Sequence, residues 1–197
     1  MGKPHHQRRQ EIIQSALALA AEQGVKKVTT QAIADRVGIA QPTVFRHFKT
    51  RDEIFAGAIA WLADQLFEAL DAGIGGDMAA DRRLEALVST QLAFVSRHRG
   101  LPRMLFSDRL HLESPMLKKV VQRVMARYTG RIAEVIGAGV ESGCFDRSVD
   151  PEQGARYVVA TIQGVIMRWS IFDFDFSLEG EAEPLSDFFR AALKSRG

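Results

Sequence analysis

One short polar and basic segment carries the side chains whose types and spacing could do chemistry. Gln41 and Thr43 stand two residues apart, and Arg46, His47 and Lys49 follow within about two helical turns. Amide and hydroxyl groups can hydrogen-bond to the edges of DNA bases, and guanidinium and ammonium groups can neutralise phosphates. On a helix, such a segment is suited to insertion into the major groove of double-stranded DNA.

The residue patterns of catalytic and metal sites do not occur in the sequence. There is no G-x-S-x-G, no glycine-rich phosphate loop and no H-E-x-x-H. Of the histidines only His5 and His6 are close in sequence, and with the single Cys144 they make a poor set of zinc or copper ligands. We therefore expect no catalytic residue, no metal, no cofactor and no enzymatic activity.

Two short helices and a turn are expected to position the polar segment. Ala32, Ile33 and Val37 repeat at helical spacing after Thr30, whose hydroxyl can cap the first helix. Gly38 follows where the chain must turn, a position that often needs a positive φ. The pattern is that of a helix-turn-helix.

The second short helix carries a proline in its first turn and an apolar side. Pro42 is tolerated there because an N–H at that position has no intrahelical acceptor. Val44, Phe45 and Phe48 supply the apolar side, which leaves the polar and basic residues facing outward. Ordinary helix packing is the alternative interpretation of this pattern taken alone.

A capping box opens the next helix. Thr50 is expected to cap it, and Glu53 to reach back to the backbone of Thr50, at the start of an amphipathic helix that continues through Leu70. Arg51 lies in the first turn, the unfavourable end of a helix for a cation. A nearby DNA phosphate would account for it.

Charge is distributed unevenly along the chain. Residues 1–51 carry nine Lys/Arg and three Asp/Glu, a net charge of +6, whereas the remaining residues carry 17 and 21, a net charge of −4. A basic head on an acidic body is the pattern expected of a DNA-binding module. An exposed basic face that serves solubility is the alternative.

Over residues 8–60 the chain resembles the tetracycline-repressor (TetR) family of bacterial transcription regulators. The resemblance rests on a first helix ending at Gly24, on the segments Thr30–Gly38 and Pro42–Phe48, and on Arg51–Ile54. It implies that DNA contacts come from these positions. The predicted DNA-binding residues are Thr30, Gln31, Gln41, Pro42, Thr43, Phe45, Arg46, His47, Lys49 and Arg51.

Three positions depart from the family pattern. Phe45 stands where a tyrosine is common, so one donor to a phosphate is lost. Arg51 replaces the usual lysine and keeps its charge. Ala40 stands where a serine or threonine cap is usual, which costs about 1 kcal/mol of helix stability.

The resemblance implies an all-α protein of two domains. Residues 1–52 would form a three-helix DNA-binding domain, and residues 53–197 a helical domain for effector binding and dimerisation. Beyond the first 60 residues, periodicity and start signals such as Ser114–Pro115 and Asp150–Pro151 predict only helices. About nine helices are expected. They are a first helix over residues 8–23, two short helices and the start of a longer one within residues 30–55, the longer one continuing through Leu70, and then helices over 82–98, 101–111, 115 to about 143, 151 to about 169 or 172, and 183 onward.

A homodimer is expected because one recognition helix buries too little surface for specific affinity, and two-fold pairing places two such helices about 34–36 Å apart. The resemblance implies an interface built from the last two helices. The alternative is that their apolar stripes pack on the chain's own core. The predicted interface residues are Val158, Ile162, Val165, Ile166, Phe188 and Phe189.

A small, mainly apolar organic effector is expected to bind in the second domain. Flexible and aromatic side chains of the kind that line apolar pockets occur on its helices, although for any single one of them an ordinary core position is the favoured interpretation. The predicted pocket residues are Phe94, His98, Met104, Phe106, Met125, Tyr128 and Trp169.

The favoured function is therefore a cytoplasmic repressor that binds a palindromic operator as a dimer and is released by its effector. No apolar run is long enough to span a membrane, and the basic N-terminal arm, residues 1–10, lacks the apolar segment of a signal peptide. The alternative is a DNA-binding protein without a small effector, controlled by a protein partner or by the redox state of Cys144.

Overall fold

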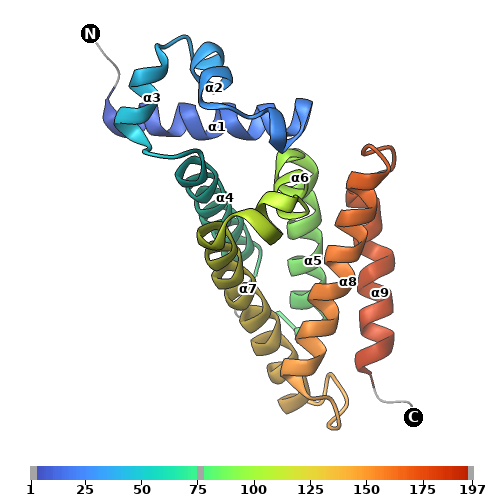
Figure 1. The fold of residues 1–197 in the computed structure, drawn as a ribbon. Helices are drawn as coiled ribbons and strands as arrows, with labels where there is room; N and C mark the ends of the chain where they lie inside the picture. The colour runs from blue at the N-terminus through green and yellow to red at the C-terminus, as the bar shows by residue number, and fades with distance from the viewer. Residues whose placement is uncertain (1–3, 75–77, 195–197) are drawn as a thin grey trace. The chain divides into compact units, whose positions relative to one another are not determined.

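The computed structural model describes residues 4–74 and 78–194, which fold into nine α-helices and contain no β-strand (Figure 1). The helices are α1 (His5–Gln23), α2 (Thr30–Val37), α3 (Gln41–His47), α4 (Arg51–Gly73), α5 (Ala80–Arg97), α6 (Gly100–Leu105), α7 (Pro115–Glu141), α8 (Pro151–Ile171) and α9 (Ala182–Leu193). Single turns of 3₁₀-helix cover Val25–Lys27 and Glu179–Glu181, and one of π-helix covers Arg109–Glu113. The all-α prediction is confirmed.

Side-chain caps begin the helices where the sequence indicates them. The hydroxyl of Thr50 accepts the N–H of Glu53 (3.1 Å), and the carboxylate of Asp150 accepts the N–H of Glu152 (2.9 Å). The carboxylate of Glu53 accepts the N–H of Lys49 (2.8 Å), one residue before the position expected from a capping box. These local hydrogen bonds satisfy donors that the first helical turn leaves unpaired.

Several expected boundaries are wrong by a few residues, and the helix expected over residues 101–111 ends at Leu105. The cap of α2 is Thr29, whose hydroxyl accepts the N–H of Ala32 (3.0 Å), and Thr30 is the first helical residue. Helix α1 begins at His5, before the expected start at residue 8. The described part of the basic N-terminal arm is therefore largely helical, and its first three residues lie outside the described residues.

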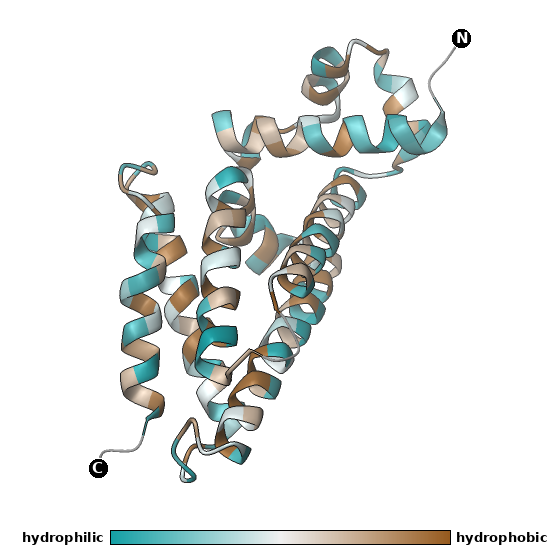
Figure 2. Ribbon diagram, turned by 180° about the vertical axis from the view of Figure 1, so that it is seen from behind, coloured by the Kyte–Doolittle hydropathy of each residue, from teal (hydrophilic) through white to brown (hydrophobic). Residues whose placement is uncertain are grey.

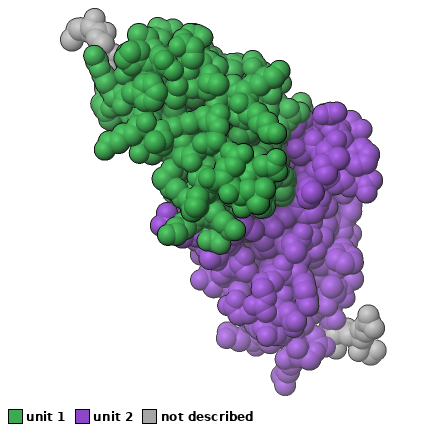
Figure 3. Space-filling model, viewed as in Figure 1, with its two compact units in different colours: residues 1–64, 98–122 green, residues 65–97, 123–197 purple. Residues whose placement is uncertain are grey.

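The chain divides into two compact units (Figure 3). Unit 1 comprises residues 1–64 and 98–122, and unit 2 comprises residues 65–97 and 123–197. The boundaries after residues 64 and 122 fall within α4 and α7, so each of these helices contributes residues to both units. The expected division into a DNA-binding domain, residues 1–52, and an effector and dimerisation domain, residues 53–197, stays a prediction.

In unit 1, α1 packs against α2, α3 and α6. Ile12, Ala16, Ile33 and Val44 are fully buried among these helices. Gly100 opens α6 so close to α1 that a Cβ there would lie 2.3 Å from the carbonyl oxygen of Leu17. Only glycine fits this approach without a shift of backbone.

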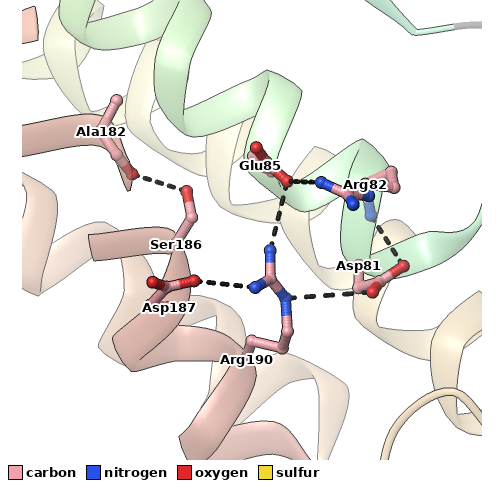
Figure 4. A network of polar contacts seen from close by, with 7 residues as sticks. All are labelled: Asp81, Arg82, Glu85, Ala182, Ser186, Asp187 and Arg190. Carbon is pink, nitrogen blue, oxygen red and sulfur yellow. Dashed lines mark hydrogen bonds and ion pairs between the residues drawn. The ribbon is translucent and has the colours of Figure 1, made fainter. Parts of the chain in front are cut away.

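In unit 2, α9 packs on α5 and α8. The guanidinium of Arg190 on α9 lies 3.2 Å from the carboxylate of Glu85 and 3.9 Å from that of Asp81, both on α5, and 2.7 Å from that of Asp187 (Figure 4). Hydrophobic and hydrophilic residues alternate along these helices (Figure 2), as expected where each buries one side.

Candidate nucleic-acid interface

Helices α2 and α3 are joined by a tight turn at Gly38, which has φ 73° and ψ 40°. The N–H of Ile39 closes the turn on the carbonyl of Ala34 (3.0 Å). This left-handed conformation favours glycine, as the sequence predicted. Ala40 precedes α3 without a side-chain cap, and Pro42 lies in its first turn.

Helix α3 is held by two apolar side chains, and its other residues are exposed or partly exposed. Val44 is fully buried and Phe48, directly after the helix, is 2% exposed. Phe45 is 47% exposed, and Arg46 and Lys49 are exposed as well. The structure therefore places an aromatic side chain and two cations on one accessible surface of the helix-turn-helix.

The candidate base-contacting side chains are partly engaged within the chain. The amide nitrogen of Gln41 donates to the hydroxyl of Thr30 (2.9 Å), which ties the start of α3 to the start of α2. The amide nitrogen of Gln31 donates to the carboxylate of Asp35 (2.6 Å) on the same helix. These bonds fix side-chain orientation in the free protein.

Arg51 has partners inside unit 1. Its guanidinium donates to the carbonyl of Val28 (3.2 Å), and burial, followed by repulsion from Arg109, lowers its pKa. Arg109 in turn pairs with Asp52, with Nε 2.7 Å from the carboxylate oxygen. The position of a cation in the first turn of α4 is thus accounted for by contacts within the chain, and its phosphate contact stays a prediction.

His47, at the end of α3, lies in a cluster of positive charge. Its ring centroid is 4.4 Å from that of His5 on α1, and its Nδ1 is buried with no hydrogen-bond partner in the described part of the chain. Burial lowers the pKa of His47, and the charges of His5, Arg9, Arg8 and Arg46 lower it further. Both effects favour the neutral form of the imidazole.

The predicted effector residues are divided between the two units. His98, Met104 and Phe106 belong to unit 1, and Phe94, Met125, Tyr128 and Trp169 to unit 2. Within unit 2, Phe94, Tyr128 and Trp169 are buried, whereas Met125 is 38% exposed. The indole N–H of Trp169 donates to the carbonyl of Phe176 (2.9 Å), so its polar atom is satisfied within the chain.

Two buried polar side chains of unit 2 occupy core positions on otherwise apolar helix faces. The hydroxyl of Tyr128 on α7 and the side-chain oxygen of Gln91 on α5 are buried and have no hydrogen-bond partner among the described residues. Tyr128 is 5% exposed and Gln91 is 9% exposed. Burial raises the pKa of the Tyr128 hydroxyl. The sequence prediction included Tyr128 but missed Gln91, which stands among leucines and valines in the apolar pattern of its helix.

Most of the predicted interface residues are buried in the single chain. Val158, Ile162, Ile166 and Phe189 are less than 10% exposed, whereas Phe188 is 60% exposed. The opposite side of α8 carries exposed apolar side chains that the sequence prediction missed. They are Tyr157, Met167 and Ile171, and the neighbouring Phe172 is exposed as well. A groove of about 530 Å³ between α8 and α9 is lined by Tyr157, Thr161 and Phe188 among others.

The described ranges contain neither a membrane-spanning helix nor a metal-binding cluster. No helix there is long and apolar enough to cross a membrane. No group of three or more His, Cys, Asp or Glu side chains in residues 4–74 and 78–194 is arranged to hold a metal ion.

A capped helix, a glycine turn and a second helix with an exposed basic surface define a helix-turn-helix DNA-binding protein. The family model of bacterial regulatory proteins of the tetR family matches residues 12–58, and the model of the tetracyclin repressor-like C-terminal domain matches residues 77–170. The chain belongs to the TetR family and is a DNA-binding transcriptional regulator.

Similar proteins match over most of the chain, and those with solved structures share its fold. Nucleoid occlusion factor SlmA of Marinomonas sp. is 24% identical over 184 residues, covering 88% of both chains. A TetR regulator of Haloarcula marismortui has a TM-score of 0.84 at 20% identity, over 96% of this chain and 100% of that chain. FadR of Bacillus subtilis, solved in complex with stearoyl-CoA, has a TM-score of 0.81 at 18% identity, over 93% and 98%.

Proposed function

We propose that the protein binds an inverted-repeat operator as a homodimer, that it represses transcription there, and that a mainly apolar small molecule bound in unit 2 releases it. The observation that carries the DNA part is the surface of α3. Its buried residues Val44 and Phe48 fix the helix in the domain, and its exposed residues are those that can meet DNA.

On this surface the contacts to DNA divide into two kinds. Arg46 and Lys49 are exposed cations placed to neutralise phosphates, which gives affinity without sequence preference. Gln41 and Thr43 meet base edges, where an amide can pair with adenine and a threonine methyl can pack on thymine. The bond from Gln41 to Thr30 leaves the amide oxygen to be presented in a fixed orientation.

The homodimer is supported by the exposed apolar side of α8 and α9. Tyr157 and Ile171 are each 64% exposed, and together with Met167 and Phe188 they form an apolar surface that water covers in a monomer. Nothing lies within 4 Å of a Cβ built at Gly164, at the middle of this side of α8, so a partner helix has room to approach. The proposed contact thus uses the side of α8 opposite Val158 and Ile162.

The effector site is supported by Tyr128 and Gln91. About nine in ten buried polar groups in proteins have a hydrogen-bond partner, so each of these two groups, without one in the described part of unit 2, is a position where a polar atom of a ligand can bind. Asp81 and Glu85 lie on the side of α5 that forms ion pairs with Arg190 of α9. At about 100° per residue, Gln91 and Phe94 lie on a different side of that helix.

The first experiment selects bound sequences from a random DNA pool with the purified protein at two salt concentrations. The proposal expects an enriched inverted repeat at both. A pool without enrichment at either concentration would contradict the proposal of a sequence-specific operator. The selected site then serves as the probe for release by candidate effectors, beginning with stearoyl-CoA because the Bacillus subtilis relative was solved with it.

The dimer is tested by Ile171→Asp, which places a charge on the exposed apolar side of α8. Sedimentation analysis is expected to give a monomer, since a buried unpaired charge opposes association. The matched control is Glu183→Asp on an exposed position of α9, which keeps the charge and is expected to leave the dimer intact. A variant at Ile171 that sediments like the wild type would contradict this interface.

A second candidate is a DNA-binding protein without a small effector, controlled by a protein partner or through Cys144. The similarity to proteins named nucleoid occlusion factor favours keeping it. Cys144 is partly exposed and lies three residues after the end of α7. The selected DNA probe separates the candidates, because release by a small molecule supports the first, and release only by oxidation or by an added protein supports the second.

A further inference from the structure

The N-terminal turn of α1 contacts the C-terminal end of α3. Nη1 of Arg9 donates to the carbonyl oxygen of His47 at 2.5 Å, although the two residues are 38 positions apart. The carbon of the same guanidinium lies 3.9 Å from the centroid of the Phe48 ring. Arg9 is thus bound simultaneously to the backbone at the end of α3 and to the aromatic side chain that anchors it.

Helix α3 needs such a contact because its own ends provide little support. It is seven residues long, and Ala40 offers no side-chain acceptor at its start. The last carbonyls of a helix have no intrahelical partner, and an isolated helix of this length is unstable in water. A cation at the C-terminal end satisfies one such carbonyl and interacts favourably with the helix dipole.

The neighbouring arginine provides a comparison. Arg8 pairs with Glu11, one turn further along α1, at 2.8 Å. Arg8 and Arg9 are both half-buried cations on the first turns of α1, and within the described part of the chain it is Arg9 whose guanidinium hydrogen-bonds to α3. Position and charge alone do not distinguish the two arginines, and on those grounds either could neutralise a phosphate.

We propose that Arg9 is a positioning residue of the recognition helix and not a phosphate contact. Its guanidinium, held between the carbonyl of His47 and the ring of Phe48, fixes the C-terminal end of α3, so that the side chains of α3 meet the base edges in one orientation. This inference rests on the proposed function only in taking α3 as the DNA-reading element.

The two roles leave different signatures in DNA binding. A phosphate contact contributes to the slope of log affinity against log salt, about one unit per contact, and weakens all sequences alike. A positioning residue changes the ratio of specific to non-specific affinity and leaves that slope unchanged. The test therefore measures affinity for the selected operator and for an unrelated duplex across a salt series.

Arg9→Gln is expected to lower the specific-to-non-specific ratio about tenfold, the effect of losing one charge-assisted hydrogen bond, with an unchanged salt slope. Arg8→Gln makes the same charge change one residue away and is expected to keep the ratio. Arg46→Gln, which alters an exposed cation of α3, is expected to reduce the slope by about one per chain. A reduced slope with a preserved ratio in Arg9→Gln would overturn the proposal.

Amide hydrogen exchange in the free protein gives a readout that does not depend on DNA. Arg9→Gln is expected to speed exchange at the N–H of Phe48, which donates to the carbonyl of Val44 (3.0 Å), while Arg8→Gln leaves it unchanged. Equal protection in both variants would contradict the proposal even if the wild type fails to select an operator. Thermal unfolding of both variants confirms that the domain is folded in the comparison.

Discussion

In unit 1, two hydrogen bonds tie α3 to other elements, and Nδ1 of His47 is the buried atom of that helix without a partner among the described residues. In unit 2, by contrast, two polar side chains lie inside apolar helix faces, and neither has a partner for its buried oxygen there. Gln41 binds Thr30, and Arg9 binds the carbonyl of His47. Gln91 and Tyr128 have a buried oxygen without a partner in the described residues. Unit 1 has the contacts expected of a preformed binding surface, and unit 2 has the unsatisfied polar groups expected of a site completed by a ligand.

The largest expected effect concerns backbone packing, at Gly100 in unit 1. Gly100→Ala places a Cβ 2.3 Å from the backbone oxygen of Leu17, so α6 must move away from α1. We expect a loss of about 3 kcal/mol in the free energy of unfolding, measured by urea denaturation. The control in unit 2 is Gly130→Ala on α7, where nothing lies within 4 Å of the added Cβ and a gain of about 0.5–1 kcal/mol is expected. Equal changes in the free energy of unfolding for Gly100→Ala and Gly130→Ala would show that the approach of α6 to α1 does not require glycine.

The surface of α3 is tested by Gln41→Ala and Lys49→Ala. Removing the amide is expected to cost about 2 kcal/mol of discrimination against altered base pairs in the operator. Removing the ammonium is expected to weaken operator and unrelated DNA alike and to lower the salt slope by about one per chain. Competition binding with single-base operator variants measures both. The division of roles fails if both variants lose discrimination equally.

Removing the buried hydroxyl of Tyr128 in unit 2 is expected to stabilise the fold. Tyr128→Phe removes a buried polar atom without changing the shape of the ring, so the free energy of unfolding is expected to rise by about 1 kcal/mol. Tyr157→Phe is the control, because the Tyr157 hydroxyl is at an exposed position and accepts from Gln153 (3.2 Å). Its effect is expected to stay within about 0.5 kcal/mol. Any small molecule found to release DNA should lose affinity for Tyr128→Phe, and an unchanged affinity would place the ligand elsewhere.

The smallest expected effect is a pH dependence from His47. Because the folded protein lowers the pKa of His47 below its ordinary value of 6.5, the unfolded chain binds more protons there. Stability is therefore lost as the pH falls through and below 6.5, and His47→Gln is expected to flatten this loss between pH 8 and 5. DNA phosphates near the cluster favour the cation, so operator affinity of the wild type is expected to rise over the same range. Identical pH profiles of wild type and variant would show that His47 causes neither the pH dependence of stability nor that of operator affinity.

The sequence predicted most of the fold because its signals are local. The turn at Gly38 and the helix starts at Thr50 and Asp150 depend on hydrogen bonds within a few residues, and the structure has them there. The cap of α2 was assigned to Thr30 and lies at Thr29, because two adjacent threonines offer the same chemistry. The π-helical turn at Arg109–Glu113 had no signal in the helical spacing.

What only the tertiary structure decided concerns side chains whose partners are distant in sequence. The apolar stripe on α8 indicates that one side of the helix is covered, but it does not indicate which element covers it. The structure places Val158 and Ile162 in the chain's own core. In the same way, composition makes Arg8 and Arg9 equivalent cations, and the fold alone brings Arg9 to the end of α3, 38 residues away. Helical periodicity and capping act over a few residues, so the sequence by itself determined the helices, the turn and the family. The pairing of faces and charges required the helices to be placed against one another.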